Sequence, residues 1–202
     1  MHLSPLPAWP GVPLPRSFYD RDPLVVAPEL LNKVLASSSG RAGRIVEVEA
    51  YRGDIDPAAH TYRGKTARNA TMFGPPGFMY VYFTYGMHWC CNTVCEAEGQ
   101  GSGVLLRALE PIAGIEQMRS ARARVKRDQE LCSGPARLTQ AMGIAGAQNG
   151  IDLVSAQQGF SVLDDGIAPP ENLVGTARIG ISRGMEHLWR WYVPGNVNVS
   201  KR

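Results

Sequence analysis

Two glutamates and a tyrosine alternate along one short stretch of this chain, and their spacing could serve acid–base chemistry. Residues 44–51 run Arg-Ile-Val-Glu-Val-Glu-Ala-Tyr. Side chains of a β-strand point alternately to opposite faces, so Glu47, Glu49 and Tyr51 should share one face beside an apolar one. The residues expected on the apolar face are Val46, Val48 and Ala50. A carboxylate in the wall of a cleft can take a proton from bound water. A solvated face, or salt bridges to arginines, is the alternative, and the alternation does not separate the two glutamates.

Residues 78–92, FMYVYFTYGMHWCCN, have the pattern of a β-hairpin with a bulky residue at its tip. Runs of Tyr, Phe and Val on either side of a glycine are typical of two strands joined by a turn. The turn falls at Tyr85-Gly86-Met87, where small polar residues are usual. A rigid finger ending in an apolar wedge is a device that separates stacked bases. The alternative is a tyrosine folded back on a neighbouring loop.

Six motifs follow one another along the chain in an order that is more specific than any one of them. They are RIVEVEAY, DPAAHTYRGKTARNATMFGPPG, YVYFTYGMHWCCN, VLLRALEP, SGPARLTQAMGI and ARIGIS. Together they resemble the alkyladenine (3-methyladenine) DNA glycosylase family, from about Phe18 nearly to the C-terminus. The resemblance implies an enzyme of base excision repair that flips alkylated or deaminated purines out of duplex DNA and hydrolyses the N-glycosidic bond.

The resemblance also assigns the catalytic groups. Breaking the bond between a base and deoxyribose is similar to glycoside hydrolysis, with an oxocarbenium-like transition state. By resemblance Glu49, and not Glu47, is the base that activates water. Arg107, in VLLRALEP, matches the arginine that holds this water, and a cation there should keep Glu49 ionised. The backbone carbonyl of Ile179, in ARIGIS, matches a third contact to the water.

A base pocket and a DNA surface are implied in the same way. Tyr51 and Tyr82 match aromatic walls, which attract positively charged alkylated bases by about 0.5–2 kcal/mol each. His60 matches a residue that packs against the base and hydrogen-bonds to it. Asn92 matches an asparagine that rejects the exocyclic amine of guanine. The residues expected at the DNA are Tyr85 as the intercalating wedge, Met87 beside it, Arg63 and Arg68.

The pocket assignments predict the register of the hairpin. A two-residue turn at Tyr85-Gly86 would pair Tyr82 with Trp89 and would place Tyr82 and Asn92 on opposite faces. A three-residue loop or a bulge reverses that parity. We therefore expect such a feature in the hairpin.

Neither a covalent intermediate nor a cofactor is expected. Glycosylases that also cut the DNA strand use an amine to form a Schiff base, and none of the four lysines matches a catalytic position of the family. Cys90, Cys91, Cys95 and Cys132 lack a secretory framework, and adjacent strand residues point apart. Buried reduced thiols are favoured over a metal site that includes His88.

Composition is compatible with these expectations without selecting them. The 202 residues carry a formal net charge of +3, too small to diagnose a nucleic-acid partner. Most of the cations are arginines, which suit phosphate oxygens, although base composition of the genome would have the same effect. No export signal or long apolar run is visible. A monomeric cytoplasmic protein that binds duplex DNA from the minor-groove side, with no membrane partner, is expected.

The predicted fold is a single α+β domain: a curved, mostly antiparallel sheet with flanking helices and a protruding hairpin. Residues 1–17 are expected to form a Pro-rich, partly mobile tail before the domain at 18–202. Helices are predicted within 23–35, with Leu30, Leu31 and Val34 facing the core, then over 113–127, and from 133–135 onward. Strands are predicted near 43–51, 78–95, 104–108, 151–154, 160–163, 177–182 and 190–193. The basic helix 113–127 could follow a phosphate backbone or be a solvated helix end.

Two other classes of function remain open from the sequence. The chain could be a catalytically silent binder of damaged DNA, which would not need Glu49 and Arg107 together. It could also be a hydrolase or transferase of free nucleosides, for which an exposed Tyr85 has no purpose.

Overall fold

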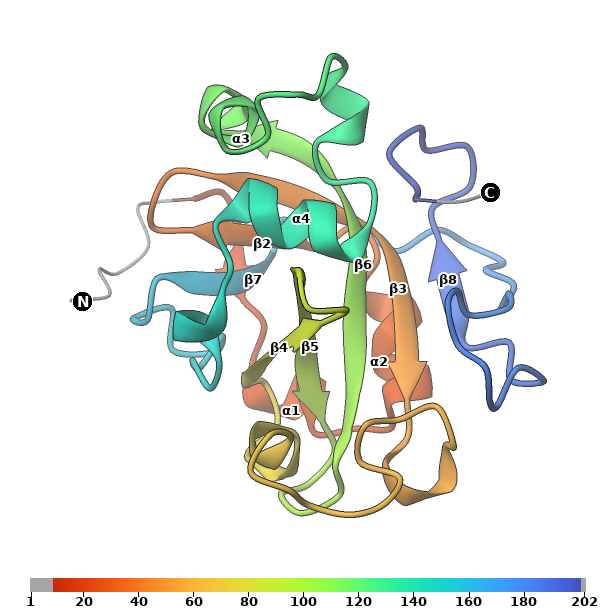
Figure 1. Cartoon of the computed structure of the whole chain (residues 1–202). Helices are drawn as coiled ribbons and strands as arrows, with labels where there is room; N and C mark the ends of the chain where they lie inside the picture. Colours follow the sequence, from red (N-terminus) through yellow and green to blue (C-terminus); the bar gives the residue numbers. More distant parts are fainter. Residues whose placement is uncertain (1–8, 201–202) are drawn as a thin grey trace.

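One antiparallel sheet organises residues 9–200, the part of the chain that this computed structural model describes (Figure 1). Its eight strands follow the order β1-β7-β2-β3-β6-β5-β4, with β8 paired to β3. The sheet curls into a half-barrel, so the predicted α+β fold with a curved antiparallel sheet is confirmed. The strands are β1 (Val12–Pro13), β2 (Val34–Ser37), β3 (Ala42–Tyr51), β4 (Met79–Thr84), β5 (His88–Cys95), β6 (Ser102–Ala113), β7 (Phe160–Asp164) and β8 (Arg190–Tyr192).

Short helices cover the sheet. The α-helices are α1 (Arg16–Tyr19), α2 (Pro23–Leu30), α3 (Ile115–Ala121) and α4 (Pro135–Met142); the 3₁₀ turns are η1 (Gly53–Ile55), η2 (Ala70–Phe73), η3 (Asp128–Glu130) and η4 (Gly146–Gln148). Helix α2 begins where Asp22 accepts a hydrogen bond from the amide of Leu24 at 2.8 Å, with a proline at its first position. It packs on β3 and β6, whereas α4 packs on β5 and β6. Apolar side chains of these helices and of the sheet form one continuous core.

Strand β3 lies at the centre of the sheet and is irregular where it carries its glutamates. It pairs along one edge with β6 and along the other with β2 and then β8. The register against β6 shifts between Ile45 and Glu47 and again between Glu47 and Val48. Such a bulge turns a side chain away from simple alternation. Val46 accordingly lies in a separate buried cluster with Ala108, and the prediction that it shares the apolar face of Val48 was wrong.

Several predicted boundaries were wrong for identifiable reasons. Strand β6 continues through Pro111, which pairs with Gly43 beside a register shift, where a residue without an N–H is tolerated. Helix α3 therefore starts later and ends at Ala121, and the amide of Arg122 caps it. Val34 is buried in β2, not in a helix. Residues 151–154 contribute only an isolated bridge at Asp152, and 177–182 form a loop.

The expected N-terminal tail is only partly visible. Residues 1–8 lie outside the described residues. Val12–Pro13 pairs with β7, and Leu14 is buried, so the following part of that segment lies on the sheet. Among residues 9–200, every helix is too short or too polar to cross a bilayer.

Candidate active site

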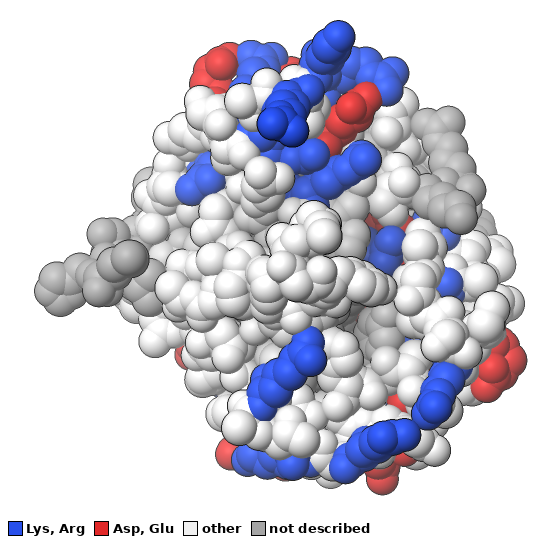
Figure 2. Space-filling view, in the orientation of Figure 1, with Lys and Arg blue, Asp and Glu red and all other residues white. Residues whose placement is uncertain are grey.

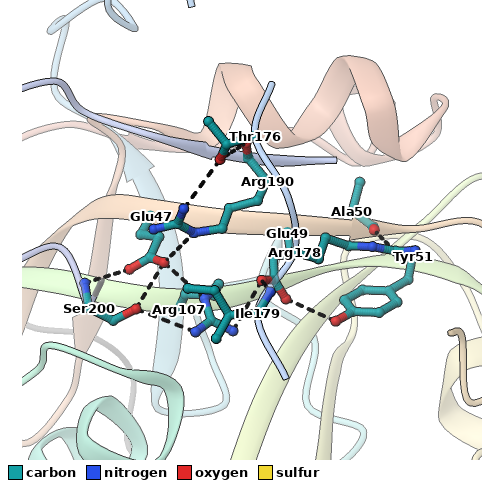
Figure 3. A network of polar contacts seen from close by, with 10 residues as sticks. All are labelled: Glu47, Glu49, Ala50, Tyr51, Arg107, Thr176, Arg178, Ile179, Arg190 and Ser200. Atoms are coloured by element: carbon teal, nitrogen blue, oxygen red, sulfur yellow. Dashed lines mark hydrogen bonds and ion pairs between the residues drawn. The ribbon is translucent and has the colours of Figure 1, made fainter. Parts of the chain in front are cut away.

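Both glutamates of β3 are fully buried. Figure 3 shows their polar contacts. The carboxylate of Glu49 has three partners. Its Oε1 accepts a hydrogen bond from the backbone N–H of Ile179 at 2.7 Å and lies 3.2 Å from Nη1 of Arg107. Its Oε2 accepts from the hydroxyl of Tyr51 at 2.9 Å. Three residues that sequence reasoning grouped with Glu49 therefore meet it directly, although Ile179 does so through its amide.

Burial and charge act in opposite directions on Glu49. Burial raises the pKa of its carboxyl above the usual value, and Arg107, the amide of Ile179 and the Tyr51 hydroxyl lower it without cancelling the rise. The expectation that Arg107 sets the ionisation of Glu49 was thus incomplete, because desolvation is the larger effect. Burial together with the charge of Glu49 also raises the pKa of Tyr51, so its hydroxyl remains a donor.

Glu47 lies in a different environment, formed by cations and the end of the described chain. Its Oε1 accepts from Nε of Arg107 at 2.9 Å and from Nε of Arg190 at 2.7 Å. Ser200 donates its amide to Oε2 at 2.7 Å and its hydroxyl to Oε1 at 2.9 Å. Although burial opposes it, the charge of Arg107 and the hydrogen bonds from Ser200 and Arg190 lower the pKa of Glu47. The salt-bridge alternative left open by the sequence is the correct one for Glu47.

A cavity of about 270 Å³ is lined in part by two residues that bind the Glu49 carboxylate. Its lining consists of residues 57–61 and 179–183 with Tyr51, Met72, Tyr80 and Asn92. Tyr51 and Ile179 thus form part of the cavity wall and at the same time bind the Glu49 carboxylate. An aromatic cavity with a few convergent polar groups and a glutamate of raised pKa has the properties of a site for a flat organic ligand.

The aromatic wall contains one residue that sequence reasoning missed. Tyr80 lines the cavity, and its ring stacks on Tyr82 with centroids 5.2 Å apart. His60 packs edge-on against Tyr82 at 4.5 Å, and its Nδ1 lies 3.5 Å from the Tyr80 hydroxyl. Tyr82 therefore supports the wall from behind. The signal for Tyr80 was present, since residues two apart on a strand share a face.

Asn92 lies on the same face of the hairpin as these tyrosines. The strands pair Tyr80 with Asn92 and Tyr82 with Cys90, around a three-residue loop. The expected change of parity is therefore confirmed. Asn92 is buried against the cavity, and its Oδ1 has no hydrogen-bond partner among residues 9–200. A buried amide oxygen without a partner costs free energy, so Asn92 is a candidate contact for a ligand in the cavity.

A buried ion pair joins the two loops that line the cavity, and sequence reasoning missed it. Arg178 donates to both carboxylate oxygens of Asp56, at 2.5 and 2.8 Å, and both side chains are fully buried. Arg178 also donates to the carbonyl oxygen of Ala50 at 3.0 Å, and its guanidinium covers the Tyr51 ring at 4.7 Å. Because Ile179 directly follows Arg178, the ion pair between Arg178 and Asp56 also fixes the position of the Ile179 amide that binds Glu49.

The hairpin tip is exposed and strained. Tyr85 is 78% exposed and has a φ of +52°, in the left-handed region that costs a non-glycine residue about 1–3 kcal/mol. Met87 beside it is 67% exposed. Arg68 donates to the carbonyl oxygen of Phe83 at 2.7 Å and so supports β4 just before the tip. Tyr85 does not fold back on a neighbouring loop.

Positive charge lies on both sides of the hairpin. Figure 2 shows lysines and arginines over α3 and the chain that follows it, and again at the opposite side of this face, with a mostly uncharged band between. Arg63 is exposed, in the loop between η1 and η2. Some cations of the predicted basic helix are paired with carboxylates, so fewer of them are available to contact phosphates than the sequence suggested. Arg119 pairs with Glu116 and Asp128, and Arg127 pairs with Glu130.

The cysteines behave as predicted. Cys90, Cys91, Cys95 and Cys132 are free and buried. Burial raises the pKa of the Cys132 thiol to about 12. No group of three or more potential metal ligands occurs among residues 9–200.

Comparison with known proteins gives one consistent result. The family described as "Methylpurine-DNA glycosylase (MPG)" matches residues 17–197. A protein of Burkholderia lata is 67% identical over 98% of this chain and 95% of its own length. Proteins of Koribacter versatilis and Carboxydothermus hydrogenoformans are 49% and 48% identical, over 93% and 94% of this chain and 93% and 99% of their own lengths. All three are provisionally named 3-methyladenine DNA glycosylases.

These similarities define the class of protein as a DNA glycosylase, a repair enzyme that acts on DNA and hydrolyses N-glycosyl bonds. Within that class, the chain belongs to the methylpurine-DNA glycosylase family, and its activity is of the DNA-3-methyladenine glycosylase type.

Proposed function

We propose that this enzyme flips a damaged purine out of duplex DNA into the cavity beside Glu49 and hydrolyses its glycosidic bond with water that Glu49 activates. The observation that carries the proposal is the shared wall: Tyr51 and Ile179 bind the Glu49 carboxylate and also line the cavity. A base held there would present its sugar bond to a buried carboxylate. The raised pKa of Glu49 suits a general base, which loses part of its strength when its pKa is low.

Arg107 and Ile179 hold Glu49 ready for that step. Nη1 of Arg107 and the Ile179 amide both contact Oε1 of Glu49, so the Glu49 carboxylate has little rotational freedom. In this proposal the Ile179 carbonyl and Arg107 also hold the attacking water. A positioned general base accounts for about 10²–10⁴-fold of the rate.

The cavity selects the base by shape, charge and one amide. Tyr51 and Tyr80 offer aromatic faces, which favour purines made cationic by alkylation. His60 hydrogen-bonds the base, and Asn92, buried in the cavity wall, excludes guanine because its side chain occupies the space that the exocyclic amine would need.

Tyr85 replaces the flipped nucleotide in the stack. Flipping costs a few kcal/mol, and one intercalated aromatic ring recovers about 1–3 kcal/mol. Met87 flanks the wedge, while Arg63 and Arg68 contact phosphates on the minor-groove side. The exposure of Tyr85 and its positive φ support this role.

The enzyme leaves an abasic site and acts as a monomer in this proposal. Schiff-base chemistry needs an amine at the sugar, and no lysine among residues 9–200 lines the cavity. Lys33 is buried against Asp164 at 2.8 Å.

Single-turnover excision tests the proposal on duplexes that contain one hypoxanthine, one ethenoadenine or one methylated purine. Glu49→Gln should abolish base release while DNA affinity persists, because the amide cannot accept the proton. Glu110→Gln is the control. Glu110 lies on β6 of the same sheet and accepts a hydrogen bond from Asn196, and its variant should retain the wild-type rate.

Equal release by wild type and Glu49→Gln would move the role elsewhere, with Glu47 the first suspect. Binding without release by wild type on every lesion would indicate a silent damage binder. A borohydride-trapped DNA adduct would contradict the monofunctional mechanism.

A further inference from the structure

Both carboxylate oxygens of Glu47 accept hydrogen bonds, although the side chain is buried and does not line the cavity. Its two oxygens accept four hydrogen bonds, from Arg107, Arg190 and the amide and hydroxyl of Ser200 (Figure 3). Burying a carboxylate with its cations costs free energy that an apolar replacement would avoid. A buried ionic cluster next to a catalytic carboxylate therefore calls for a role other than stability.

The geometry of Arg107 suggests that role. A guanidinium is planar and presents its donors in a fixed fork. Glu47 holds Nε at 2.9 Å, and the Ser200 hydroxyl lies 3.4 Å from Nη2. With these two donors occupied, Nη1 is the nitrogen left beside Glu49, where it forms an ion pair 3.2 Å from Oε1. The orientation of the catalytic contact is thus determined from the opposite side of the guanidinium.

We propose that Glu47 is a positioning residue for base excision: it fixes the plane of the Arg107 guanidinium so that Nη1 faces Glu49. This inference rests on the proposed function, in which Glu49 is the base. Arg107 contacts Glu49 and, in the proposed function, the attacking water. Both contacts depend on the orientation of the guanidinium plane. A misplacement of about 1 Å in such a group costs on the order of 100-fold in rate.

Glu47 also acts on Glu49 through its charge. The negative charge of Glu47 raises the pKa of Glu49, and both carboxylates interact with Arg107. Loss of that charge lowers the pKa of Glu49, whereas displacement of Arg107, the larger influence, raises it. A variant that lacks the charge should therefore have the acid limb of its pH–rate profile at lower pH than a variant that keeps the charge but releases Arg107. The charged or titratable groups that bear on Glu49 are Glu47 and Tyr51 on β3, Cys90 on β5, Arg107 on β6 and Arg178 in the C-terminal loop.

Single-turnover rates against pH, with DNA affinity measured alongside, test the proposal. Glu47→Asp keeps the charge but withdraws it from Arg107, so it should bind lesion duplex like wild type, react about 10- to 100-fold more slowly, and have its acid limb at higher pH than wild type. Glu47→Gln should be similarly slow, but because it also loses the charge its acid limb should lie at lower pH than that of Glu47→Asp. If Glu47→Gln does not fold, Glu47→Asp carries the test.

Two comparisons separate positioning from a general structural effect. Asp165→Asn removes a carboxylate paired with Arg44 at 2.7 Å, near the other end of β3, and should keep the wild-type rate and acid limb. In an Arg107→Lys background, Glu47→Asp should cost little further rate, because the two residues act as one unit.

A wild-type rate for Glu47→Asp, or additive losses in the Arg107→Lys background, would overturn the proposal. An acid limb of Glu47→Gln at or above that of Glu47→Asp would also overturn it. Failure of the proposed function is distinguishable, because Glu49→Gln would then still release base.

Discussion

Neutralising Asp56 tests how the cavity is held together. Its carboxylate makes a two-pronged contact with Arg178, and both side chains are inaccessible to solvent. Asp56→Asn leaves the guanidinium buried without a counter-charge. Breaking a buried pair in this way costs about 3–5 kcal/mol in the free energy of unfolding. The loss is large because Arg178 also holds the Ala50 carbonyl and covers Tyr51.

Urea unfolding followed by tryptophan fluorescence measures this loss. With a denaturant slope of about 2 kcal/mol per molar urea, the midpoint should fall by about 1.5–2.5 M. Trp189 contacts the Arg178 guanidinium at 5.1 Å and reports on the same region. Asp128→Asn, which removes one of the two carboxylate partners of Arg119 at the surface, is the matched control and should leave the midpoint unchanged. Equal midpoints for the two variants would refute the reasoning.

The same variant has a consequence for chemistry. Displacement of Arg178 moves the Ile179 amide, whose hydrogen bond lowers the pKa of Glu49. The pKa of Glu49 should therefore rise, and the acid limb of excision should move to higher pH.

Two further outcomes are expected. Tyr85→Ala should slow excision from paired duplex by about 5- to 150-fold, the equivalent of 1–3 kcal/mol of stacking, and should affect an unpaired lesion less; equal effects on both substrates would contradict the wedge. In the wild type, single-turnover rates should fall as pH decreases through the pKa of Glu49, which burial raises above its usual value, because only the carboxylate accepts a proton. A rate that is constant down to the usual glutamate pKa would argue against Glu49 as the base.

The sequence predicted the strands well where apolar periodicity was strong. Strands β3, β4, β5 and β7 lie close to their predicted ranges, because alternation and β-branched residues mark them. Strand β6 was predicted too short, since Pro111 looked like an end and the bulge opposite Gly43 is a tertiary feature. The loop at 177–182 looked like a strand because its apolar residues line a cavity instead of pairing.

The site was predictable in its parts and not in its connections. Resemblance to the family indicated Glu49, Arg107 and Ile179, and its assignment of Asn92 to the pocket predicted the change of hairpin parity that the strands show. The ion pair between Asp56 and Arg178 joins residues 122 positions apart in the sequence, and no local sequence pattern predicts so distant a contact. The balance of burial against charge on Glu49 also depends on neighbours that only the fold assembles.

The distance along the chain between Glu47 and Ser200 has a consequence for biosynthesis. The two residues are 153 positions apart, so on a ribosome that adds 5–20 residues per second Glu47 emerges about 8–30 s before its last partner. During that interval the nascent chain carries two carboxylates on a strand whose final neighbours, β8 and the loop before it, have not been made. The contacts of Glu47 therefore form only after Ser200 has been made, and a nascent chain stalled before β8 would hold β3 without Arg190 and Ser200, two of the partners of Glu47.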